Sequence, residues 1–341
     1  MHFHTSPLLP ILFFTLYLTS CAQPLPVQTE FVLGTVCTVN LYDRGSAKIY
    51  REIFTRLREI EDRMSANKEG TEVDEVNRNA GLAPVSVHPV VLAVTGAALY
   101  YAELSRGAFD PTIGSLVKLW NIGSDDARVP SALEIQSALP LVGYRDLVID
   151  EKAGTLFLKR PGMRLDLGAI AKGYAADEVA RIIKSHRIPR AMVDLGGNIL
   201  AYGSKSGGAP WRIGVQDPVS ERGNHIGILE TINKTLVTSG VYERYLEADG
   251  KHWHHILNTK TGYPVENGLV SVTIVADHSI DADGLSTTVF ALGYEAGRAL
   301  VESIPGIDAI FINSDLEIRV SEGLRGKFRV SDERFRLIET D

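Results

Sequence analysis

The chain has 341 residues, of which 45% are hydrophobic and 23% are charged. This composition is typical of a globular protein with a large core, and it excludes a disordered chain or a multispanning membrane protein. The formal net charge of −7 provides no basic surface for a nucleic acid, so nucleic-acid binding is set aside.

The N-terminus carries an apolar segment, residues 8–18, that is too short to span a membrane and contains Pro10. It ends in Leu-Thr-Ser-Cys21, which resembles the lipobox of bacterial lipoproteins. We therefore expect residues 1–20 to be a signal peptide, Cys21 to be lipidated, and residues 21–30 to form a tether. The protein would then sit on the periplasmic side of the cell envelope, with the inner membrane favoured.

This N-terminal pattern departs from the lipoprotein class in one respect, because no Lys or Arg precedes the apolar segment. A plain secretory signal and an incidental cysteine are the alternatives. The second cysteine, Cys37, lies in an alternating run at residues 35–41, where a small buried apolar side chain is expected. If Cys21 is acylated, no intramolecular disulfide is available.

Helical and alternating patterns are mixed along the rest of the chain. We expect helices at residues 52–64, 90–104 and 284–292, the last ending at Gly293. We expect strands at residues 35–41, 147–149, 155–158, 212–215, 235–237 and 269–275. No linker divides the region, so residues 31–341 are predicted to form one α+β catalytic unit.

The most informative segment is Asp166-Leu-Gly-Ala-Ile-Ala-Lys-Gly-Tyr-Ala-Ala-Asp177. Alternation before Asp166 indicates a strand, and apolar spacing afterwards indicates a helix that opens near Ala169. The first N–H groups of that helix and the charge of Lys172 would both favour a bound phosphate. The alternative is an ordinary strand-to-helix turn.

A second segment, residues 276–287, contains Asp281 and ends in Asp283-Gly-Leu-Ser-Thr287. If a helix starts near Asp283, then Asp283 and Thr287 share one face. Their carboxylate and hydroxyl are hard oxygen ligands that suit Mg²⁺. Asp281 or Asp283 could also be the helix N-cap, and Asp281 is a weaker candidate ligand for the same ion.

The run His252-Trp-His-His255 contains three histidines. On a strand, His252 and His254 would share one face while His255 pointed to the other, and no cysteine or carboxylate cluster completes a zinc site. Zinc is therefore set aside. The unperturbed pKa of a histidine lies near neutrality, so His255 could serve as a proton shuttle.

Several blocks of this chain resemble, in the same order, those of the ApbE family, the FAD:protein FMN transferases. The strongest is the segment from Asp166 to Asp177. The others are Gly107–Ile113 with Trp120, Val193–Asn198, Trp211–Pro218, Thr238–Gly240, His254–Ile256 with Gly262–Pro264, and Asp283–Thr287. An ordered series of blocks is far more specific than a single short motif.

The resemblance implies a T-fold-related catalytic unit with an antiparallel sheet and flanking helices. It also implies Mg²⁺-dependent transfer of FMN from FAD to a Thr or Ser hydroxyl of an acceptor protein, with release of AMP. The family's acceptors are flavoprotein subunits of membrane redox pumps. If water attacks instead, the same site is an FAD pyrophosphatase. A lipid-anchored protein that stores FAD without turnover is the competing function. The acceptor, the ratio of hydrolysis to transfer and the oligomeric state stay open.

The same resemblance implies roles for individual residues. Mg²⁺ would be held by the Ala169 carbonyl, Asp283 and Thr287, and Asp283 or His255 would accept the proton of the nucleophile. FAD would be bound by Asn67, Ala108, Phe109, Asp110, Asp166, Lys172, His255 and Ile256. Phe109 could equally be a core residue, and Asp166 could simply end its strand.

One position departs from the family pattern. Many members have M-S-x-Y after the first helix, with an aromatic ring that stacks on the flavin dinucleotide, whereas this chain has Met64-Ser-Ala-Asn67. Loss of such a stacking contact typically costs about 0.5–1.5 kcal/mol beyond area burial. We therefore expect weaker flavin retention, faster product release and a larger share of hydrolysis.

Overall fold

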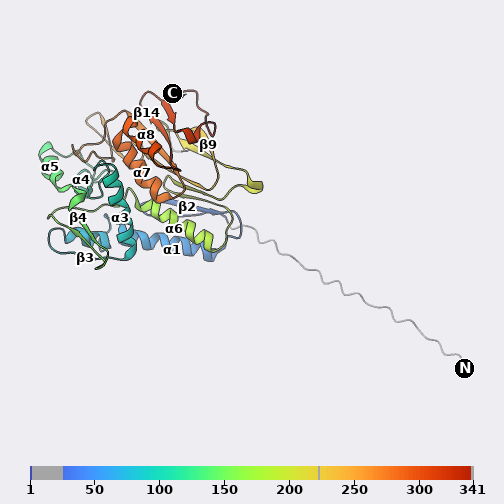
Figure 1. The fold of residues 1–341 in the computed structure, drawn as a ribbon, viewed down its shortest axis with the longest axis horizontal. Helices are drawn as coiled ribbons and strands as arrows, with labels where there is room; N and C mark the ends of the chain where they lie inside the picture. Colours follow the sequence, from blue (N-terminus) through green and yellow to red (C-terminus); the bar gives the residue numbers. More distant parts are fainter. Residues whose placement is uncertain (2–25, 222, 339–341) are drawn as a thin grey trace.

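The computed structural model describes residues 1, 26–221 and 223–338 (Figure 1). Within these residues a nine-stranded sheet has the order β1-β2-β6-β7-β10-β13-β14-β15-β17. Adjacent strands are antiparallel except for the parallel pair β15 and β17. The strands are β1 (Gln28–Val32), β2 (Thr35–Leu41), β6 (Ala191–Leu195), β7 (Asn198–Tyr202), β10 (Lys234–Gly240), β13 (Leu269–Ala276), β14 (Asp308–Asn313), β15 (Glu317–Val320) and β17 (Arg336–Leu337). The expected signal peptide and Cys21 lie outside the described residues.

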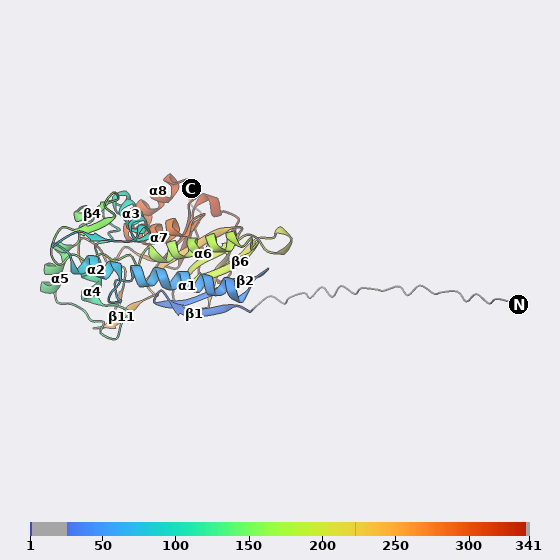
Figure 2. The ribbon, with the colours of Figure 1, turned by 90° about the horizontal axis from the view of Figure 1, so that it is seen from below.

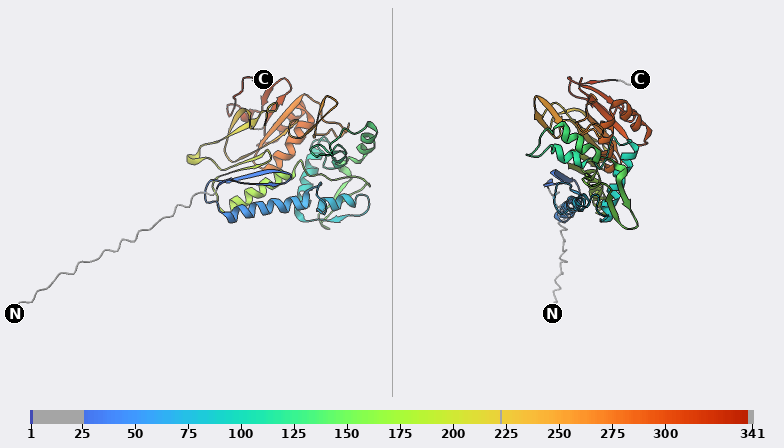
Figure 3. Two further views of the ribbon diagram at one scale, coloured as in Figure 1. Left: turned by 180° about the vertical axis from the view of Figure 1, so that it is seen from behind. Right: turned by 90° about the vertical axis from the view of Figure 1, so that its left-hand side faces the viewer.

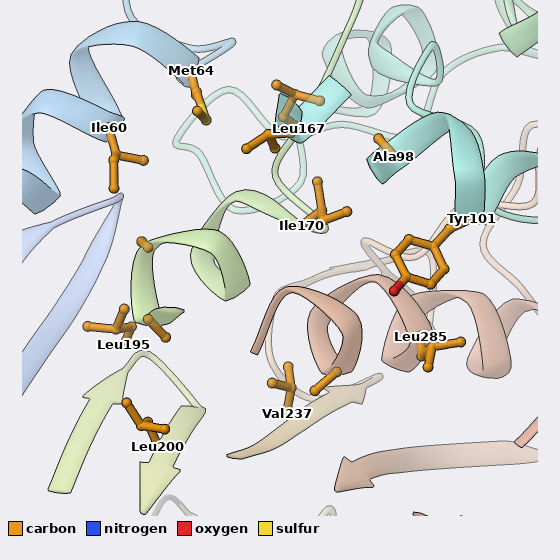
Figure 4. Close-up of a cluster of buried hydrophobic side chains, with 14 of the residues drawn as sticks. Ile60, Met64, Ala98, Tyr101, Leu167, Ile170, Leu195, Leu200, Val237 and Leu285 are labelled. Atoms are coloured by element: carbon orange, nitrogen blue, oxygen red, sulfur yellow. The ribbon is translucent and has the colours of Figure 1, made fainter. Parts of the chain in front are cut away.

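Helices cover one face of this sheet. Figures 2 and 3 show α1 (Ala47–Met64) and α6 (Ala171–Ser185) running side by side, and α7 (Ser279–Leu292) leads into α8 (Tyr294–Ser303). The largest apolar cluster joins α1, α6 and α7 to the sheet (Figure 4). The fully buried apolar residues of α1 recur at helical spacing, so one stripe of this helix faces the core.

The other face packs against a smaller sheet of β8 (Trp211–Gln216), β9 (His225–Thr231) and β16 (Phe328–Val330). A second apolar cluster lies between the two sheets. Consecutive residues of β10 illustrate the arrangement, because Val237 belongs to the helix-side cluster and Leu236 to the sheet-side cluster. The sheet is therefore buried on both faces along β10. The side chains on its helix side face the layer that contains α7.

A third group of elements lies at one end of the molecule (Figure 1). It comprises α2 (Glu72–Arg78), α3 (Pro89–Leu104), α4 (Gly114–Trp120), α5 (Ala132–Ala138), β3 (Val85–Ser86), β4 (Leu147–Asp150) and β5 (Thr155–Leu158). Trp120 is fully buried there, and its Nε1 donates to the Gly262 carbonyl at 2.8 Å. The hairpin of β11 (Tyr245–Ala248) and β12 (Lys251–His254) contacts this region through Trp253.

The predicted α+β class is confirmed, and the strands expected at residues 35–41 and 155–158 match β2 and β5. The first helix begins at Ala47 rather than Glu52, because Ser46 Oγ caps it by accepting the Ile49 N–H. Cys37 is fully buried as expected, and burial raises the pKa of its thiol to about 12. None of the helices in the described part of the chain is long and apolar enough to cross a bilayer.

Candidate active site

The segment before α6 is not the strand that the alternation before Asp166 indicated. Residues 163–167 form no strand, and only Arg164 makes an isolated bridge, to Ile113. Asp166 Oδ1 accepts the Gly168 N–H at 2.8 Å, so this carboxylate shapes the turn that leads into the helix. The helix begins at Ala171, slightly later than the opening near Ala169 that the spacing predicts, and its N-cap Ile170 supplies no side-chain hydrogen bond. The first turn therefore depends on other elements for its capping partners.

The start of α7 corrects one expectation from the sequence. The helix begins at Ser279 rather than near Asp283, and neither Asp281 nor Asp283 is its N-cap. Its first amides are capped from another helix, since the Asp177 carboxylate accepts the N–H groups of Ser279 at 2.8 Å and Ile280 at 2.9 Å. Asp283 consequently lies inside the helix, one turn beyond its start.

Asp283 is the buried carboxylate at the crossing of α6 and α7, with 3% of its surface exposed. Its Oδ2 accepts the Gly173 N–H at 2.8 Å, and its Oδ1 lies 3.8 Å from Lys172 Nζ. Gly173 permits this contact because a Cβ there would lie 2.3 Å from the Ser279 carbonyl oxygen and 2.7 Å from Asp283 Cβ. The first turn of α6 thus carries the positive charge of Lys172, and its Gly173 N–H is capped by the Asp283 carboxylate of α7.

The same contact leaves the Ala169 carbonyl without its usual hydrogen-bond donor in the helix. In a regular helix the Gly173 N–H would bond to the carbonyl four residues earlier, but here it donates to Asp283 Oδ2. Thr287 lies one turn beyond Asp283 on the same face of α7. The set of one carboxylate, one hydroxyl and one carbonyl fits the hard oxygen preference of Mg²⁺. The described residues contain no group of three or more His, Cys, Asp and Glu side chains that could hold a metal, so a site here depends on this mixed set.

Asp281 does not join this set, contrary to its expected place as a weaker ligand. Residues two apart in a helix point about 200° apart, so Asp281 faces away from Asp283. Its Oδ1 instead accepts the Tyr101 hydroxyl of α3 at 2.6 Å. Figure 4 shows the Tyr101 hydroxyl directed at α7. Burial and this bond raise the pKa of Tyr101 far above its usual range.

The loop at residues 108–110 is held by its own polar side chain. Asp110 is buried and accepts the N–H and hydroxyl of Thr112 and the N–H of Tyr144 at 2.7–2.8 Å. Burial raises the pKa of Asp110, although these bonds oppose the shift. Phe109 packs in the core with its ring 6.3 Å from that of Tyr101. Ala108 is the member of this block whose side chain is partly exposed.

The three histidines have separate partners, and they do not form one cluster. His252 stacks on Tyr245 with ring centroids 4.1 Å apart. His254 is buried, with its Nε2 donating to the Val265 carbonyl at 2.9 Å. His255 Nδ1 donates to the Arg244 carbonyl at 3.1 Å, which leaves Nε2 as the acceptor nitrogen.

The pKa of His255 differs from the near-neutral value expected of a proton shuttle. Burial lowers this pKa to about 3, and the positive charges of Arg244 and Lys172 act in the same direction. The expectation of a near-neutral pKa is therefore wrong for this structure, and the ring is a neutral acceptor at pH 7. Ile256, the next residue, is buried.

Asn67 lies on the exposed loop that follows α1, where its N–H donates to Ser65 Oγ at 3.3 Å.

Three further residues contribute to the site, although the sequence analysis gave them no role. Asp177 and Gly173 belong to the segment that follows Asp166, but only the approach of α7 reveals their function. Ser239 of β10 also contacts the site, with its Oγ 3.3 Å from Thr287 Oγ1.

Fold and site together define an α+β protein in which a buried carboxylate and a lysine meet at a helix N-terminus, with a partly exposed hydroxyl and a backbone carbonyl nearby. A sequence profile of the ApbE family matches residues 33–311, and the chain belongs to that family. The FAD:protein FMN transferase of Treponema pallidum is 40% identical over 327 residues, covering 90% of each chain. A protein of the same name from Klebsiella pneumoniae is 37% identical and covers 90% of this chain and 95% of its own.

Solved structures agree with this assignment. The ApbE protein of Thermotoga maritima superposes with a TM-score of 0.81 at 34% identity, covering 89% of this chain and 99% of its own. The flavin transferase ApbE of Vibrio cholerae gives a TM-score of 0.79 at 30% identity, covering 89% and 98%. The two structures support the fold over nearly the whole described chain.

Proposed function

We propose that this protein transfers FMN from FAD to a Thr or Ser hydroxyl of an acceptor protein and releases AMP. The relatives that match most of its length carry the name FAD:protein FMN transferase. The observation that carries the proposal is the Asp283 carboxylate on the first turn of α6, bonded to the Gly173 N–H beside Lys172. Asp283 does not cap α7, so its carboxylate faces the first turn of α6, where a phosphate would bind.

The residues present have a direct use in such a reaction. Lys172 and the amides at the start of α6 would hold the pyrophosphate of FAD by charge and hydrogen bonds. Asp283, Thr287 and the Ala169 carbonyl would hold Mg²⁺, which when bound offsets negative charge on the pyrophosphate oxygens. Phe109 and Asp110 fix the loop that presents Ala108, and Asp166 shapes the turn that leads into α6. Ile256 is buried next to His255 and would line the site from that side. Catalysis would thus depend on positioning and electrostatics.

The bonds exchanged follow from the substrate. The hydroxyl oxygen of the acceptor attacks the phosphorus of the FMN half, the P–O–P linkage breaks, and AMP leaves with the electron pair. The hydroxyl proton must pass to a base. Both Asp283 oxygens already have partners, whereas His255 Nε2 is an acceptor, so we assign the proton to His255. An anionic pyrophosphate beside His255 would raise its low pKa during the reaction. When water attacks, the products are FMN and AMP.

The decisive experiment measures AMP release from FAD by residues 22–341, with Mg²⁺ and with EDTA. Wild type should release AMP only with Mg²⁺, and Asp283→Ala should lower the rate by at least about 100-fold, as expected for loss of a charged group at the reacting phosphate. Thr238→Ala, which changes a hydroxyl on the opposite face of β10, is the matched control. FAD that is bound but unbroken, even with an acceptor protein present, would favour FAD storage instead.

The location of the reaction is part of the proposal. Acylation of Cys21 would hold the catalytic unit on the periplasmic face of a membrane, and the inner membrane is favoured. The acceptors would then be flavoprotein subunits of membrane redox pumps, whose exposed Thr or Ser side chains could reach the site. The anchor would serve this geometry by confining enzyme and acceptor to one surface.

A further inference from the structure

Three hydroxyl groups form a hydrogen-bonded chain behind the proposed metal ligands. Ser239 Oγ of β10 lies 2.9 Å from Ser286 Oγ and 3.3 Å from Thr287 Oγ1, both of α7. Ser286 Oγ donates to the backbone carbonyl of Asp283 at 2.9 Å. The chain therefore connects the strand to the helix that carries Asp283 and Thr287.

The carbonyl at the end of the chain sets the direction of every bond in it. A carbonyl oxygen only accepts, so the single proton of Ser286 is committed to Asp283 O. One order forms all three bonds with one proton from each hydroxyl: Ser286 Oγ accepts the proton of Ser239, and Ser239 Oγ accepts the proton of Thr287. Thr287 consequently points its hydroxyl proton toward β10 and keeps its lone pairs on the other side.

The buried end of the chain preserves this order. Ser286 is 1% exposed, so water does not offer its hydroxyl a competing partner. Thr287 and Ser239 are partly buried, which leaves the outer end of the chain accessible from the site. Thr287 shares a face of α7 with Asp283, whose Oδ1 lies near Lys172.

We propose that Ser239 and Ser286 are positioning residues that orient Thr287 as an electron-pair donor, which prepares this oxygen to bind a divalent cation beside Asp283. This inference rests on the proposed function, because it assigns a task to residues behind its metal site. Neither serine is assigned as a ligand of the ion. Without Ser286, the Ser239 proton would turn toward Thr287 Oγ1 and compete with a cation for the same lone pairs.

The same strand provides an internal control. Thr238 precedes Ser239 and its Oγ1 lies 2.8 Å from Thr273 Oγ1 of β13, on the face that points away from α7. Thr238→Ala therefore removes a hydroxyl–hydroxyl bond of similar length without touching the chain. Ser239→Thr is the conservative variant, because it keeps a hydroxyl at the central position.

The test measures the affinity of the full-length protein for divalent cations in the absence of FAD. Calorimetry measures Mg²⁺ binding, and electron paramagnetic resonance measures Mn²⁺ binding. Ser239→Ala and Ser286→Ala should each weaken binding by about 10-fold, as partners behind metal ligands typically do. Thr238→Ala should bind as wild type does, and Ser239→Thr should recover most of the affinity. Melting temperatures in EDTA would show that each variant is folded.

The outcomes separate this inference from the function on which it rests. If wild type and Asp283→Ala bind the cations equally, or neither binds them, the metal site and the inference both fail. If Asp283→Ala loses binding while Ser239→Ala and Ser286→Ala match wild type, the metal site stands and the inference is overturned. Loss of affinity in Thr238→Ala equal to that in Ser239→Ala would also overturn it, because a general effect of β10 would then explain both.

Discussion

Two adjacent histidines should make the protein less stable in mild acid. Burial lowers the pKa of His254, and it lowers the pKa of His255 to about 3. The unfolded chain has histidine pKa values near 6.5. The neutral rings therefore contribute stability above pH 6.5, and this contribution is lost as the pH falls from 6.5 toward 3, because the unfolded state binds more protons.

The measurement is urea unfolding between pH 7.5 and 4.5 for wild type and His255→Gln. Each proton taken up on unfolding adds a slope of about 1.4 kcal/mol per pH unit at most. The free energy of unfolding should fall less steeply in the variant below pH 6.5. Parallel curves for the two proteins would show that His255 does not carry this dependence.

Asn67 should determine how firmly the flavin is held. In the family pattern a tyrosine at this position stacks on the dinucleotide, so Asn67→Tyr should bind FAD about 2- to 10-fold more tightly, from about 0.5–1.5 kcal/mol of stacking. It should also release AMP to water more slowly. Asn67→Leu, which adds apolar area without a ring, separates stacking from simple burial. Equal FAD affinities and AMP rates in wild type and Asn67→Tyr would refute the prediction.

The crossing of α6 and α7 depends on the absence of a side chain at Gly173. Gly173→Ala should lower stability by about 1–3 kcal/mol, because its Cβ would overlap the Ser279 carbonyl and Asp283 Cβ. Gly96→Ala in α3 is the control, since a Cβ there meets nothing within 4 Å, and it should be neutral or stabilising by up to about 1 kcal/mol. Calorimetric melting distinguishes them, and equal melting temperatures would contradict the close contact.

The capping of α7 shows why one helix boundary was predicted incorrectly. The rule that an Asp near a helix start caps it is local, and Asp283 satisfies it in sequence. The actual cap comes from Asp177, which is 102 residues away from Ser279. The end of the same helix was predicted correctly, because Gly293 adopts a φ of 80° and this preference belongs to glycine itself.

For the molecule as a whole, the proposed anchor predicts a change of location. Cys21→Ser expressed in a bacterial host should move the protein from the membrane fraction to the soluble periplasmic fraction, while the AMP release rate per molecule stays the same. Fractionation, with mass spectrometry of the N-terminus, measures both parts. A wild-type protein whose N-terminus carries no acylated Cys21 would rule out the lipid anchor.

The sequence alone determined the α+β class, the family resemblance, the strands β2 and β5 and the burial of Cys37. These follow from local periodicity and from short ordered motifs, which need no knowledge of distant contacts. It also brought together Asp283 and Thr287, since spacing of four residues places them on one helix face.

Only the tertiary structure decided which polar groups are free and which are occupied. Asp281 is bound to Tyr101, 180 residues away, and Asp283 is bound to the Gly173 amide, 110 residues away. The low pKa of His255 and the proton order at Ser239 arise in the same way. Hydrogen bonding and burial depend on partners that folding brings into contact, so these properties cannot be obtained from the periodicity of a single segment.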